Sequence, residues 1–122
     1  MERQKVVVLV RAGSFGLMRP TDYEQQIQAA KRQLEDASPP AVVEVAGSIA
    51  GLHERLGRAG VDTVVFFSRG VLDDALAVKR RYGIKVVLLT GLSDDLDEFK
   101  SEITILDKFV WKPESFLNAV LS

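Results

Sequence analysis

Apolar runs rich in β-branched residues recur along this chain, and each is followed by a segment with helical character. A continuous apolar run is typical of a strand buried on both faces, as in a parallel sheet covered by helices. Strict alternation of such strands with helices predicts an α/β fold, a doubly wound three-layer sandwich around a five-stranded parallel sheet. The predicted strands are Lys5 to Val10, Ala41 to Ala46, Asp62 to Phe67, Lys85 to Thr90 and about Lys108 to Trp111.

Capping signals bound the predicted helices. Thr21 and Glu24 have the spacing of a capping box, which starts a helix. Ser48 is a favourable N-cap, and Pro113 suits a first helical turn because that turn leaves its amide groups unpaired. The predicted helices run from Thr21 to about Asp36, from Ser48 to Gly60, from Leu72 to Tyr82, from Ser93 to about Lys100 and from Glu114 to Leu121. The predicted inward residues of the first two are Tyr23, Ile27, Ala30 and Leu34, then Ile49, Leu52 and Leu56.

Length and charge narrow the functional classes. A chain of 122 residues is long enough for one domain with a real core, so we expect a single domain over residues 1–122. A formal net charge of −1 gives no long-range attraction to nucleic acid or to an anionic membrane. The absence of cysteine excludes a disulfide, a thiolate metal site and a cysteine nucleophile. No apolar run has the length of a signal peptide or membrane span, so we expect a cytoplasmic protein.

Polar residues follow the buried parts of several predicted strands. Thr90 ends one strand, Lys112 follows the last, and Arg11 and Ser68 follow the first and third. The carboxyl ends of parallel strands meet at one edge of a sheet, where open α/β folds place their ligand sites. We therefore expect a crevice at this edge, with the Thr90 hydroxyl and the Lys112 ammonium group pointing into it.

The alternation of strands and helices, together with Thr90 and Lys112-Pro113, resembles the receiver domain of bacterial response regulators over the whole chain. The separation of Thr90 and Lys112 is 22 positions (112 − 90), as in receivers of two-component systems. Phe109 lies three residues before the lysine, where that family has an aromatic switch residue. The resemblance implies a flavodoxin-like sheet with the strand order 2-1-3-4-5.

The phosphorylation chemistry of that family requires groups that this sequence lacks. Receivers hold magnesium with an acidic pair after the first strand and accept a phosphoryl group on an aspartate that ends the third. Here these positions are Arg11-Ala12 and Ser68, so the resemblance implies a degenerate phospho-site crevice formed by Arg11, Ala12, Ser68, Thr90 and Lys112. A cation at Arg11 repels magnesium by roughly 1 kcal/mol or more per charge at close range, even in high dielectric. A serine hydroxyl is a poor acceptor without an activating base or metal. The resemblance therefore implies a pseudo-receiver that keeps the fold and loses phosphorylation. The sequence offers the crevice no paired carboxylates, no nucleophile–base pair and no metal set, so we expect no enzymatic activity, no metal and no cofactor.

Two interpretations of the crevice cations stay open. Arg11 is either a solvated loop residue or a fixed cation at the former metal position, paired with one of the carboxylates of Asp73, Asp74, Asp94 and Asp95. Lys112 either contacts an anion or only donates a hydrogen bond to Ser68 or to a carbonyl group. For Thr90, the alternatives are a functional hydroxyl and a cap for local backbone groups.

Phe109 and Trp111 are expected to share one side of the last strand, because strand residues alternate between faces. The resemblance implies that this side, with the helices Ser93 to Lys100 and Glu114 to Leu121, is the surface that receivers use for dimers and downstream targets. Trp and Phe are enriched in the cores of protein interfaces. The alternative is that Trp111 is covered by Phe116 or by the preceding helix.

From these observations we predict a phosphorylation-independent signalling module that contacts a protein partner, or a second copy of itself, through the face with Phe109 and Trp111. The alternative is a regulatory domain that binds a small anion or nucleotide in the crevice around Arg11, Ser68, Thr90 and Lys112. Two cations and two hydroxyl groups at one sheet edge suit such a ligand.

Overall fold

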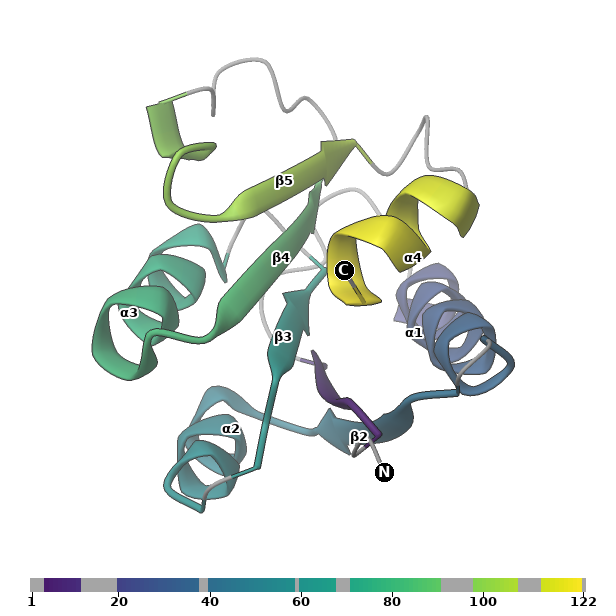
Figure 1. The fold of residues 1–122 in the computed structure, drawn as a ribbon, viewed down its shortest axis with the longest axis horizontal. Helices are drawn as coiled ribbons and strands as arrows, with labels where there is room; N and C mark the ends of the chain where they lie inside the picture. Colours follow the sequence, from purple (N-terminus) through teal and green to yellow (C-terminus); the bar gives the residue numbers. More distant parts are fainter. Residues whose placement is uncertain are drawn as a thin grey trace.

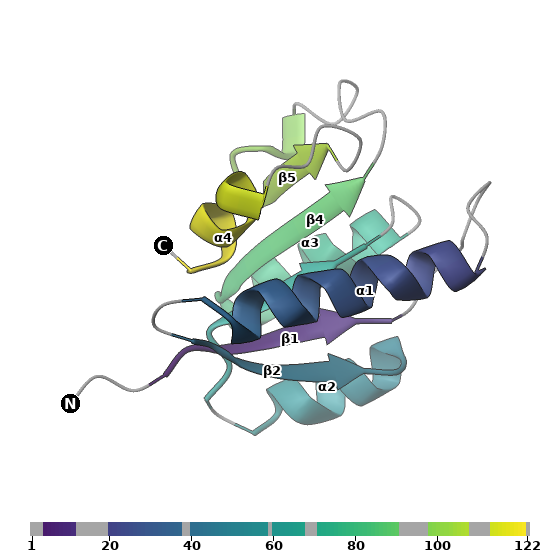
Figure 2. The ribbon, with the colours of Figure 1, turned by 90° about the vertical axis from the view of Figure 1, so that its right-hand side faces the viewer.

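The computed structural model of the protein describes residues 4–11, 20–37, 40–58, 60–67, 71–90, 98–107 and 113–121. Its strands and helices, which Figures 1 and 2 show from two sides, follow one another along the chain. They are β1 (Val6–Val10), α1 (Pro20–Glu35), β2 (Val42–Ala46), α2 (Ile49–Leu56), β3 (Thr63–Phe66), α3 (Leu72–Tyr82), β4 (Lys85–Thr90), β5 (Thr104–Asp107) and α4 (Pro113–Leu121).

The strands form one five-stranded sheet in the order β2-β1-β3-β4-β5, and every neighbouring pair is parallel. The predicted fold class and strand order are therefore confirmed. In Figure 1, α2 and α3 lie on one face of the sheet, and α1 and α4 lie on the other. None of the described helices has the length and apolar character needed to cross a bilayer.

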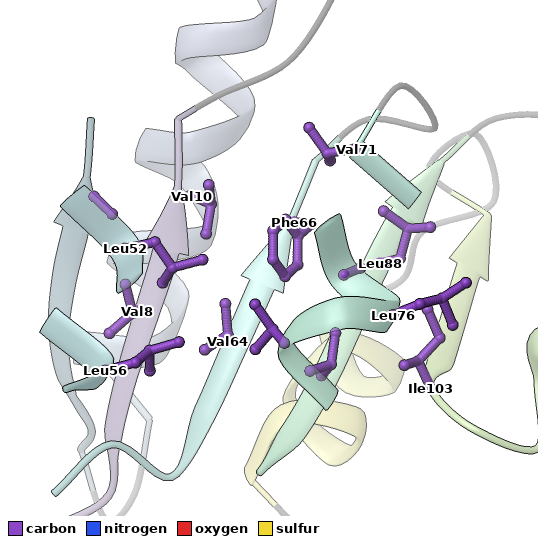
Figure 3. Close-up of a cluster of buried hydrophobic side chains, with 14 residues drawn as sticks. Val8, Val10, Leu52, Leu56, Val64, Phe66, Val71, Leu76, Leu88 and Ile103 are labelled. Atoms are coloured by element: carbon purple, nitrogen blue, oxygen red, sulfur yellow. The ribbon is translucent and has the colours of Figure 1, made fainter. Parts of the chain in front are cut away.

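The sheet has a hydrophobic core on each face, because successive residues of a buried strand point to opposite sides. Val8 and Val10 of β1 belong to the core under α2 and α3 (Figure 3), and Val7 and Leu9 belong to the core under α1 and α4. All these side chains are at most 1% exposed. The predicted inward residues of the helices that the structure places in these cores are Ile27, Ala30, Leu34, Leu52 and Leu56.

Local signals account for the ends of the middle helices. The Ser48 hydroxyl accepts a hydrogen bond from the amide of Gly51 at 3.0 Å, so Ser48 is the predicted N-cap of α2. The helix α3 has its predicted bounds, and Gly83 ends it with φ +68°, a left-handed conformation that glycine adopts without steric cost. The helix α2 ends at Leu56, earlier than the predicted end at Gly60, which has φ +108°.

The start of α1 differs from the prediction. Pro20 is its first residue, so Thr21 lies within the helix and is not its N-cap. Proline at this position is favourable because its fixed φ suits a helix. The predicted capping role of Glu24 is replaced by side-chain contacts to Arg11 and Gln28.

The last strand also differs from the prediction. The strand β5 is formed by Thr104–Asp107 and pairs with β4 in a register that places Leu88 beside Ile105 and Thr90 beside Asp107. It follows Ile103, which is 3% exposed and anchors the segment in the core under α3. The predicted range from Lys108 to Trp111 lies outside the described residues. Of the predicted helix from Ser93 to Lys100 only the end is described, and there Glu98 and Phe99 lie in a 3-10 turn.

Candidate functional site

Arg11 lies at the carboxyl edge of the sheet, directly after β1. Its backbone amide donates a hydrogen bond to the carbonyl of Ala46, at the end of β2, over 2.8 Å. Its side-chain Nη2 donates to Oε1 of Glu24 on α1 over 2.5 Å. The predicted carboxylate partners of Arg11 were on other segments, so the structure assigns this cation a different partner.

Glu24 was not predicted from the sequence as the carboxylate partner of Arg11. Its Oε1 also accepts a hydrogen bond from Nε2 of Gln28, one helical turn further along α1, at 3.2 Å. The Arg11 and Glu24 side chains are 42% and 41% exposed, so their ion pair contributes only about 0–1 kcal/mol to stability. Its chemical effect is local: the cation after β1 already has a carboxylate beside it.

Thr90 occupies the predicted place at the carboxyl end of β4. It is 2% exposed, and the only other buried polar side chain among the described residues is Thr63. Thr63 is in register with Lys85 at the start of β4, and Thr90 is at the end of β4. The two threonines therefore lie at opposite ends of the strands, Thr63 at the amino end and Thr90 at the carboxyl end. Burying a hydroxyl is costly unless it is hydrogen-bonded, so each threonine marks a position where the interior is polar.

The remaining candidate residues lie outside the described part of the chain. These are Ala12, Ser68 and Lys112 of the crevice, and Phe109 and Trp111 of the predicted interface. One described neighbour is buried: Phe67, which directly precedes Ser68 in the sequence, is 1% exposed. Phe66 is in register with Val10 of β1 and with Leu88 of β4, so these three strands reach the same edge.

The helix α4, which begins directly after Lys112, is fixed to the sheet along its length. Phe116 and Val120 are fully buried in the core shared with α1. At the far end, the Thr63 hydroxyl donates to the carbonyl of Val120 at 3.2 Å, and the Lys5 ammonium group donates to the carbonyl of Leu121. These bonds satisfy carbonyl groups that the last helical turn leaves without an internal partner.

Lys85 lies at the same edge of the sheet as these α4 contacts, in register with Thr63. Burial, and then repulsion from Lys5, hold the pKa of Lys85 below its usual value. Desolvation disfavours the charged form of an amine, which explains the direction of the main effect. This cationic edge is opposite to the candidate crevice.

No family model matches the chain, and no curated protein matches it. Solved structures do resemble it. A signal receiver domain of an HD domain-containing protein from Pseudomonas fluorescens Pf-5 superposes with a TM-score of 0.71 at 20% identity, and the match covers 96% of this chain and 91% of that one. An uncharacterized protein from Neptuniibacter caesariensis also gives 0.71 at 20% identity, with 95% and 85% covered.

A CheY-like response regulator receiver domain protein from Methanospirillum hungatei JF-1 gives a TM-score of 0.62 at 16% identity, with 95% of this chain and 90% of that one covered. This chain has the receiver fold. Within the receiver fold, Thr90 ends β4 and Arg11 follows β1, at the edge where the resemblance places phosphorylation chemistry. The Arg11–Glu24 ion pair belongs to this edge.

Proposed function

We propose that the chain is an atypical, phosphorylation-independent receiver-like signalling module without catalytic activity of its own. It acts through protein–protein contact, with a downstream partner or a second copy, on the predicted face formed by Phe109, Trp111 and the predicted helices Ser93 to Lys100 and Glu114 to Leu121. The observation that carries the proposal is the Arg11–Glu24 ion pair on a receiver fold. A guanidinium group stands where the resemblance requires a carboxylate for magnesium, and its own carboxylate partner neutralises it.

The same ion pair weighs against the alternative of an anion or nucleotide site. That alternative needs the positive charge of Arg11 to be available in the crevice, together with Lys112. An anion must compete with Glu24, which holds Nη2 of Arg11 at 2.5 Å. Protein contact through the Phe109 and Trp111 face needs no free charge at this edge.

An amide-resolved NMR titration with magnesium and beryllofluoride, the phosphoryl mimic, tests the loss of phosphorylation. We expect no saturable shifts at Ser68, Thr90 or Lys112. Saturable shifts there that extend to Phe109 would contradict the proposal, because they would show a crevice that binds an anion and communicates with the proposed face. A variant that combines Arg11→Asp, Ala12→Asp and Ser68→Asp restores the acidic pair and the acceptor, and it is the positive control for magnesium binding.

Two neighbouring alanine variants test the proposed face. Trp111→Ala is expected to weaken self-association or partner binding, because aromatic residues dominate the energy of interface cores. Lys112→Ala, one residue further, is the matched control and is expected to leave binding nearly unchanged. The reverse pattern, with Lys112 essential and Trp111 dispensable, would support the anion site and refute protein contact.

A further inference from the structure

The outer edge of β2 carries backbone groups that are ready to pair. The strand is first in the sheet order, so among the described strands only β1 is hydrogen-bonded to it. The amide of Val42 donates to Lys5, and the carbonyl of Ala46 accepts from Arg11, both toward β1. Alternate residues of a strand direct their amide and carbonyl groups to opposite edges. Val43 and Val45 therefore direct theirs away from the sheet.

Among the described residues, this edge has few of the features that usually prevent strand pairing. Natural edge strands are protected by charged side chains, especially lysine, by proline, bulges or very short length, or by a covering helix or loop. The strand β2 has the sequence Val-Val-Glu-Val-Ala, and its register with β1 is continuous over five pairs without a bulge. Val42 is 41% exposed, and among the described residues it is the one large hydrophobic side chain that is exposed to solvent. The single charged residue of β2, Glu44, forms an ion pair with Arg55.

We propose that a second copy of this chain pairs with the outer edge of β2 in the antiparallel direction, which joins the two sheets. The arrangement is self-complementary because valines flank Glu44 on both sides. When Glu44 of each copy lies on the two-fold axis, the outward backbone amide and carbonyl groups of Val43 pair with those of Val45 of the second copy. Those of Val45 pair in the same way with Val43 of the second copy. Val42 then faces the small side chain of Ala46 of the second copy and loses its exposure.

The charge at the centre of this pairing explains the role of Arg55. Two facing glutamates would repel each other. Here Nε and Nη2 of Arg55 donate to the two oxygens of Glu44 at 2.7 and 2.9 Å. These hydrogen bonds, followed by the charges of Arg55 and Arg58, hold the pKa of Glu44 below its usual value of 4.5. Each carboxylate therefore enters the interface with its guanidinium partner beside it.

Because edge pairing buries less area than a standard interface, we expect a weak, concentration-dependent dimer. Sedimentation velocity and amide shifts of residues 42–46 over protein concentration measure it. Val42→Lys introduces the usual edge protection, and Gln25→Lys on the exposed side of α1 is the matched control. Val42→Lys is expected to raise the dimer dissociation constant by about tenfold or more, and Gln25→Lys is expected to leave it unchanged.

Arg55→Gln supplies an independent test through charge. It exposes two facing carboxylates and is expected to weaken the dimer by about tenfold, since like charges directly opposite each other are destabilising. Adding Glu44→Gln to Arg55→Gln removes both charges and is expected to restore dimerisation. Circular dichroism of each variant verifies that the monomer stays folded.

The outcomes separate this inference from the proposed function. A chain that stays monomeric at about 1 mM, well above the range of specific complexes, overturns the inference alone. A dimer that is insensitive to Val42→Lys but lost in Trp111→Ala also overturns it, and it supports the proposed face. A dimer lost in Val42→Lys and unaffected by Trp111→Ala supports β2 pairing.

Discussion

Replacement of Thr63 by valine removes one buried hydroxyl group that joins β3 to the last turn of α4. Thr63 is 2% exposed, and its hydroxyl donates to the carbonyl of Val120 at 3.2 Å. A net intramolecular hydrogen bond contributes about 0.5–1.5 kcal/mol, and the carbonyl left behind is at the end of a helix. We expect Thr63→Val to lower the free energy of unfolding by about 1 kcal/mol, although valine suits the strand.

Urea unfolding followed by circular dichroism measures this loss, with an unchanged slope if the compactness of the unfolded chain is the same. Hydrogen exchange localises it, because the amides at the end of α4 are expected to lose protection before those of the sheet. Thr63→Ser is the matched control: it loses a methyl group but keeps the donor, so α4 stays protected. A Thr63→Val variant as stable as the original chain, with α4 equally protected, would refute the reasoning.

Three further changes have expected magnitudes. Phe116→Ala removes a fully buried aromatic ring between α4 and the sheet and is expected to cost about 3–5 kcal/mol in urea unfolding. Ser48→Ala removes the hydroxyl that caps the amide of Gly51 and is expected to cost about 1 kcal/mol, with Ser48→Asp as the tolerated control. Glu44→Gln removes an ion pair that stabilises the protein by about 0.2–1 kcal/mol. Because the pKa of Glu44 is lowered from 4.5 in the folded protein, this contribution is present above that pH and is lost as the pH falls through the folded value. Unfolding at low protein concentration at pH 7 and in acid tests this, and an equal difference at both would contradict it.

The central elements were predicted well because their signals are local. The bounds of α3 and β4 match the prediction, since Gly83 ends the helix in a left-handed conformation and the apolar run of β4 follows directly. The last strand was less predictable: β5 precedes the predicted range from Lys108 to Trp111, which lies outside the described residues. The residues that form β5 are Thr104–Asp107, and their partners on β4 become known only from the three-dimensional register.

The candidate site was predicted less completely, for a physical reason. The sequence shows which residue types follow each strand. In the structure Arg11 follows β1 and Thr90 ends β4, and the crevice that these residues are expected to line stays a prediction. The partner of Arg11 is a long-range choice among many carboxylates. A capping box gave Glu24 a local role, but with Pro20 as the first helical residue its side chain is available to Arg11 instead.

The Arg11–Glu24 pair has little to do with holding α1 on the sheet, because exposed ion pairs contribute about 0–1 kcal/mol. The buried residues Ile27, Ala30 and Leu34 do that. The pair changes the net charge that a ligand meets directly after β1, because the carboxylate of Glu24 offsets the guanidinium charge of Arg11. Magnesium requires negative charge at this position, and an anion requires positive charge, whereas a guanidinium group bonded to a carboxylate offers neither in excess. Contact with another protein, the function proposed above, depends on shape and apolar area elsewhere on the surface, so the neutral Arg11–Glu24 pair does not oppose it.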